Sequence, residues 1–84
     1  MQLKSGAILK ISLSKSETLY FKVLKVEMSA LAVKQICTVK DGVLIKERQN
    51  APCSYIYRSE VGGYYLEVDE SEVDWLRERY QATK

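Results

Sequence analysis

Residues 18–28 read TLYFKVLKVEM, and the spacing of their apolar side chains changes once along the stretch. Up to Val23 the aliphatic and phenylalanine side chains occupy odd-numbered positions, and from Leu24 onward they occupy even-numbered ones. Because successive side chains of a strand point to opposite faces, one flat strand would expose half of this set to water. The sequence therefore predicts a long strand with a β-bulge or sharp bend near Val23 and Leu24, which keeps both sets inward. The β-branched and aromatic content favours this strand over a helix.

The stretches on either side predict further strands. Residues 6–14 alternate apolar and polar side chains and end in a polar run that is typical of a hairpin loop. Residues 31–40 and 43–48 are β-rich and are separated by Asp41-Gly42. This dipeptide suits a two-residue turn in which both central residues have positive φ. The predicted cross-strand pairs are Val39 with Leu44 and Thr38 with Ile45.

A second hairpin is predicted over residues 54–68, after a loop at residues 49–52. Gly62 and Gly63 would form its turn. The register then places Arg58 opposite Glu67 as an opposite-charge pair. The side chains expected on the other face are Tyr57, Val61, Tyr64, Leu66 and Val68.

The end of the chain predicts a helix over about residues 70–82. Asp69 or Ser71 can cap its start, since each is followed three residues later by an acidic residue. The apolar stripe that can lie against the sheet consists of Val73, Leu76 and Tyr80. The exposed acidic ridge beside it consists of Glu70, Asp74 and Glu78.

These elements predict a mostly β fold: a small, strongly bent antiparallel sheet or SH3-like barrel of five to six strands with one C-terminal helix. A chain of 84 residues has room for one core, so residues 1–84 are expected to form a single domain. Its β-rich part spans residues 6–68. No apolar run is long enough to span a bilayer, and we expect a cytoplasmic protein with no membrane partner.

Residue types missing from the chain argue against an enzyme. There is no histidine, which is the commonest general base and zinc ligand. Cys37 and Cys53 alone do not make a zinc site and are expected to be free thiols, so no metal or cofactor is predicted. A ribonuclease that works without histidine and depends on Arg48 or Arg58 is a third alternative.

Charge is distributed unevenly along the chain. Residues 1–50 contain nine Lys and Arg against four acids, and residues 51–84 contain four against seven. Basic groups interleaved with an aromatic side chain can bind a phosphate backbone, so nucleic-acid binding is the alternative function. The net charge of +2 favours the simpler interpretation that strand lysines keep sheet edges soluble. The residues of the alternative site, expected on outward faces, are Lys10, Tyr20, Lys22, Lys25 and Lys34.

Trp75 lies off the apolar stripe of the predicted helix, next to Arg79 on the helical wheel. It is either a second core anchor, which we favour, or an exposed binding hot spot. The leading hypothesis is a small non-enzymatic intracellular protein-binding module, such as a regulator or inhibitor of a larger protein. Unpaired sheet edges also leave room for a homodimer. The candidate protein-binding residues are Trp75, Arg79, Glu78, Asp74 and Tyr65, the last of which is expected to point outward.

Overall fold

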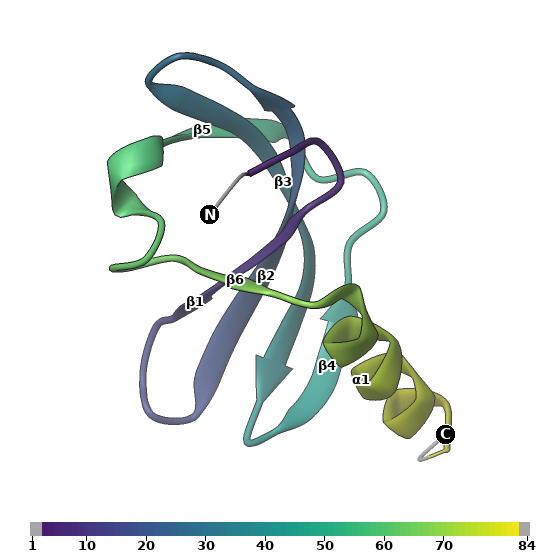
Figure 1. Ribbon diagram of the computed structural model, residues 1–84. Helices are drawn as coiled ribbons and strands as arrows, with labels where there is room; N and C mark the ends of the chain where they lie inside the picture. Colours follow the sequence, from purple (N-terminus) through teal and green to yellow (C-terminus); the bar gives the residue numbers. More distant parts are fainter. Residues whose placement is uncertain (1–2, 83–84) are drawn as a thin grey trace.

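The computed structural model describes residues 3–82, with side chains through Tyr80, as one bent antiparallel sheet followed by a helix (Figure 1). This confirms the predicted mostly β fold with a C-terminal helix. The sheet is barrel-like but not closed. The strands within residues 3–82 are β1 (Ile8–Ser12), β2 (Glu17–Val26), β3 (Ala30–Lys40), β4 (Val43–Glu47), β5 (Cys53–Tyr57) and β6 (Leu66–Val68). A 3-10 turn, η1 (Arg58–Glu60), joins β5 to β6, and the helix is α1 (Glu70–Ala82).

The long strands β2 and β3 form the centre of the sheet, whose order is β4-β3-β2-β1-β6. Both β4 and β5 pair with β3, at opposite ends of its length. In Figure 1, β5 therefore crosses the top of the molecule, while β4 and α1 lie together at the bottom. The two ends of the same long strands thus carry different neighbours.

The predicted bulge in β2 is present. Val23 pairs with Val33 and Lys25 pairs with Ala32, so Leu24 is the extra residue. The expectation that the apolar set after the bulge would point inward is wrong for two of its members. Leu24 is 40% exposed because it is the bulged residue, and Met28 is 96% exposed because it lies in the turn after β2 ends.

Core side chains lie on both faces of the sheet. The helix-side cluster comprises Ile8, Tyr20, Ile36, Cys37, Val39, Leu44, Val73 and Leu76. The barrel cluster comprises Leu9, Val23, Leu31, Val33 and Ile56. The outward placement predicted for Tyr20 is therefore wrong. Since α1 covers the face to which Tyr20 points, its side chain is buried.

The β3–β4 hairpin has the predicted turn, with φ of 53° at Asp41 and 78° at Gly42. Val39 pairs with Leu44, as predicted. The pairing of Thr38 with Ile45 is wrong, because a register shift between β3 and β4 makes Ile45 an extra residue and brings Lys46 opposite Thr38. Ile45 is accordingly half exposed.

The second predicted hairpin does not form. β5 pairs with β3 and β6 pairs with β1, so the chain between them spans the open end of the sheet. β4 covers only one end of β3, and the edge left free at the other end pairs with β5. Arg58 lies in η1, where its guanidinium donates to the backbone oxygens of Glu27 and Met28, each at 3.4 Å, and it does not face Glu67. Tyr57 and Tyr64 are exposed.

Helix α1 begins as the sequence predicts. The Asp69 carboxylate accepts a hydrogen bond of 2.9 Å from the backbone N–H of Ser71, which is a helix cap. This hydrogen bond lowers the pKa of Asp69. The apolar stripe of Val73, Leu76 and Tyr80 packs on the helix-side cluster. The predicted acidic ridge is exposed.

Candidate functional site

A groove of about 830 Å³ lies between α1 and the ends of the β1–β2 and β3–β4 hairpins. Residues of β1, β2, β3, the β1–β2 loop and the β3–β4 turn form the sheet side, and α1 contributes the opposite wall. We call it the Trp75 groove. Its charged and aromatic side chains are Lys10, Lys15, Tyr20, Asp41, Glu72, Trp75 and Arg79.

A hydrogen-bonded network forms one wall of the Trp75 groove. The Tyr20 hydroxyl donates to Glu72 Oε2 at 2.5 Å, and Lys10 Nζ lies 3.3 Å from the same oxygen. Burial raises the pKa of Tyr20, and the hydrogen bond to Glu72 and the charge of its carboxylate raise it further. Tyr20 therefore stays a neutral donor, and the charge of Glu72 is balanced by Lys10.

Trp75 and Arg79 form the outer rim of the groove. The guanidinium carbon of Arg79 lies 4.7 Å from the centre of the indole, and its Nη1 donates to the Gly42 backbone oxygen at 3.3 Å. The contact with the β3–β4 turn holds Arg79 over the ring. The favoured interpretation of Trp75 as a core anchor is wrong, since its side chain is 53% exposed. The buried stripe of α1 is narrow, and Trp75 lies beside it, facing the groove.

The remaining protein-binding candidates lie in two places. Asp74 and Glu78 are exposed on α1, one residue before and three residues after Trp75. Tyr65 is half-buried against the barrel cluster, and its ring meets that of Phe21 edge to face at 5.9 Å. Burial raises the pKa of Tyr65. The prediction that Tyr65 points outward is wrong because η1 folds the β5–β6 connection back over the open end of the sheet.

A second hollow, of about 430 Å³, lies beside the other flank of α1. We call it the basic cleft. Lys22 and Lys34 are directly opposite each other on β2 and β3, and Arg48 and Arg77 complete its cations. Arg77 is paired with Glu47 at 2.6 Å. The other carboxylate lining the cleft is Glu70.

The residues predicted for nucleic-acid binding do not form one patch. Lys22 and Lys34 line the basic cleft, whereas Lys10 and Tyr20 line the Trp75 groove. Lys25 lies 3.7 Å from Glu27 in an exposed ion pair. Sequence reasoning missed the exposed tyrosines of β5, because it assigned that strand to a hairpin with β6.

The two cysteines are free thiols in different surroundings. Cys37 is fully buried in the helix-side cluster, and Cys53 is exposed at the start of β5. Burial raises the pKa of the Cys37 thiol to about 11, with Arg77 opposing the rise and Glu47 adding to it.

The raised pKa of Cys37 predicts loss of stability in alkali. The unfolded thiol ionises from about pH 9, whereas the folded thiol stays protonated until about pH 11. The stabilisation is thus complete below pH 9 and is lost as the pH rises towards 11, by about 2–3 kcal/mol. Urea denaturation at a series of pH values measures it. Replacing Cys37 by alanine should flatten the fall between pH 9 and 10, whereas an unchanged fall would show that another group causes it.

Within residues 3–82 no group of three metal-ligating side chains comes together, and no helix has the length and apolar character needed to cross a bilayer. No protein-family model, curated protein or solved structure matches the chain. Function is therefore inferred from the side chains that line the Trp75 groove and the basic cleft.

Proposed function

We propose that this chain is a small non-enzymatic protein-binding module that receives an acidic segment of a larger protein in the Trp75 groove, as a regulator or inhibitor of that protein. The observation that carries the proposal is the half-exposed Trp75, held under Arg79 at the rim of an 830 Å³ groove. Tryptophan and arginine dominate binding hot spots, and a side chain held in place loses less entropy on binding.

The charges of the groove favour an acidic partner. Glu72 is already balanced by Lys10, so Lys15 and Arg79 remain against the single carboxylate of Asp41. The half-exposed indole of Trp75 lines the same groove and suits an apolar side chain of the partner. We therefore expect a segment with one or two carboxylates beside a large apolar residue.

Selection from a random-peptide display library tests this expectation. The folded chain is the bait, and a Trp75→Ala variant serves for counter-selection. Enriched peptides should combine Asp or Glu with a large apolar residue. They should lose at least tenfold in affinity for the Trp75→Ala variant, the loss typical of a hot spot.

A matched control distinguishes peptide binding in the groove from non-specific binding to any exposed aromatic side chain. Tyr64 is an exposed aromatic residue that does not line the groove. A Tyr64→Ala variant should bind the selected peptides as the unmodified chain does. The proposal fails if no peptides are enriched, if Trp75→Ala binds them equally well, or if they carry no acidic residues.

A further inference from the structure

The sheet face that carries α1 continues beyond the helix as an exposed surface. Lys22 pairs with Lys34, and Lys34 in turn pairs with Cys53, so this row crosses β2, β3 and β5. Two residues further along β5 lies Tyr55, opposite Ala32, and two further lies Tyr57. Since alternate residues of a strand share a face, the lysines and both tyrosines point to the same side.

The lysines of this face are available to an external anion. Like charges directly opposite on neighbouring strands destabilise a sheet. The ion pairs among the described residues involve other cations, and neither Lys22 nor Lys34 takes part in one. Arg48 adds a third cation to the same basic cleft and donates a hydrogen bond of 3.4 Å to Gln35 Oε1, while Arg77 is paired with Glu47. An anion bound here would relieve the repulsion between the lysines.

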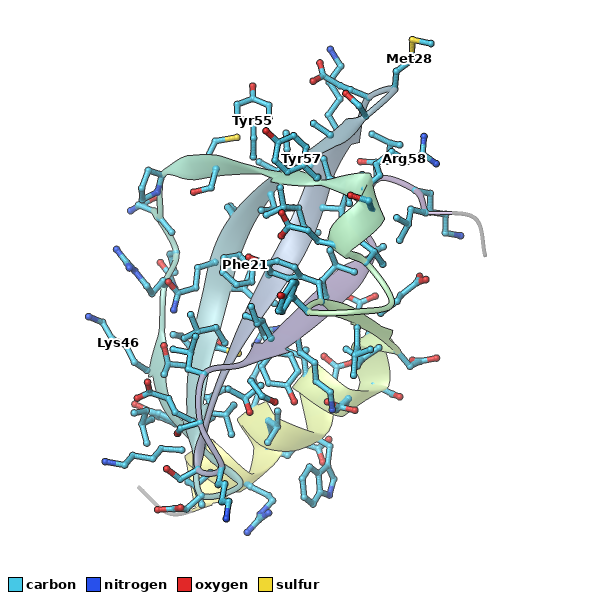
Figure 2. The ribbon with its side chains drawn as sticks, turned by 90° about the vertical axis from the view of Figure 1, so that its left-hand side faces the viewer. Phe21, Met28, Lys46, Tyr55, Tyr57 and Arg58 are labelled. Atoms are coloured by element: carbon cyan, nitrogen blue, oxygen red, sulfur yellow. The ribbon has the colours of Figure 1, made fainter. Side chains whose placement is uncertain are left out.

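The tyrosines supply flat aromatic surface next to these cations. Tyr55 is 68% exposed and Tyr57 is 66% exposed. Figure 2 shows both rings projecting from β5 at the end of the molecule that also carries Met28, whereas Phe21 lies inside. Two residues of a strand are about 7 Å apart, so the two rings form neighbouring platforms. Their cross-strand neighbours, Ala32 and Ala30, are too small to cover them.

We propose that this tyrosine–lysine face, defined by Lys22, Lys34, Arg48, Tyr55 and Tyr57, binds single-stranded nucleic acid. The cations hold backbone phosphates and the two rings stack on successive bases, which is how small β-rich domains bind single strands without sequence preference. The bases of a duplex are stacked on one another, so they cannot stack on the tyrosine rings. An acidic peptide would use the lysines but has no bases to stack on the tyrosines. The site is separate from the Trp75 groove.

Fluorescence anisotropy with labelled oligouridylate and oligodeoxythymidylate of about twelve nucleotides tests the proposal, over a salt series starting near 20 mM. Each of Lys22→Gln and Lys34→Gln should weaken binding and reduce the slope of log affinity against log salt by about 0.7. Tyr55→Ala and Tyr57→Ala should each weaken binding at least about fivefold and leave the slope unchanged.

Two control variants match these in chemistry. Lys46, paired with Thr38, lies on the opposite face of the sheet, and Tyr64 lies outside the strands. Lys46→Gln and Tyr64→Ala should leave oligonucleotide affinity within twofold of the unmodified chain. Trp75→Ala should also leave oligonucleotide affinity unchanged. Failure of peptide binding at the Trp75 groove can therefore be told apart from failure of nucleic-acid binding at the tyrosine–lysine face.

Three results would overturn the proposal. The first is no binding at the lowest salt concentration, or affinity that does not depend on Lys22 and Lys34. The second is equal binding of a duplex with no loss in the tyrosine variants, which would indicate a purely electrostatic contact. The third is displacement of the oligonucleotide by polyglutamate at the same concentration of charge, which would indicate an acidic protein partner instead.

Discussion

Replacing Leu31 by alanine is expected to lower the free energy of unfolding by about 3–5 kcal/mol, because the change leaves a cavity in a fully packed site. The Leu31 side chain is 0% exposed in the barrel cluster, opposite Ile56 of β5. Urea denaturation followed by far-ultraviolet circular dichroism measures the loss. For a small domain this loss is a large part of the total stability, and Leu31→Ala can fail to fold. Leu31→Met is therefore measured as a milder variant, with an expected loss below about 1.5 kcal/mol.

Leu24→Ala is the matched control for Leu31→Ala. Leu24 is the bulged residue of β2 and is 40% exposed, so its loss should stay below about 1 kcal/mol. Equal losses at Leu24 and Leu31 would mean that Leu24 is buried. The bulge would then not lie where the register of β2 and β3 places it.

The second large effect is expected for Leu76→Ala, which should lower the free energy of unfolding by about 2–5 kcal/mol. Leu76 is buried between α1 and the sheet, in the helix-side cluster. Trp75→Ala, at the preceding residue, removes a half-exposed ring and its contact with Arg79, and should lower it by no more than about 1 kcal/mol. Urea denaturation of both variants is followed by circular dichroism. Tryptophan fluorescence cannot be used, because Trp75 is the one tryptophan of the chain and Trp75→Ala removes it.

The comparison of these neighbouring residues also tests the openness of the groove. If Trp75→Ala lowers the stability as much as Leu76→Ala does, Trp75 is a core residue. The Trp75 groove would then be closed, and its proposed partner would have no access to the indole.

Local signals in the sequence were sufficient for part of the fold. The phase change near Leu24 predicts the bulge, and Asp41-Gly42 predicts the turn whose φ angles the structure shows. Asp69 and the stripe of Val73 and Leu76 predict the start and the buried face of α1. Each of these features depends on residues that are close together along the chain.

Long-range pairing was not predictable in the same way. Gly62 and Gly63 suggest a hairpin between β5 and β6. Instead, β5 pairs with the free edge of β3, and β6 pairs with β1. The burial of Tyr20 likewise depends on which sheet face α1 covers. Alternation within one strand cannot reveal a sheet that is buried on both faces by different elements.

The candidate sites follow from these long-range choices. The pairing of Lys22 with Lys34 requires the β2–β3 register, and the exposure of Tyr55 and Tyr57 requires β5 at the sheet edge. The sequence identified Trp75 and Arg79 as neighbours on the helix. It did not show that the β3–β4 turn binds Arg79 and that the adjoining surface is hollow.

Intrinsic fluorescence is the most direct measurement of the proposed binding mode, because the single tryptophan lies at the groove. Titration with a selected acidic peptide should move the emission maximum to shorter wavelength as the indole leaves water. Titration with oligouridylate should leave the emission maximum in place, since the tyrosine–lysine face does not include Trp75. A peptide that binds, as shown by its own anisotropy, without shifting the emission of Trp75 would contradict the account.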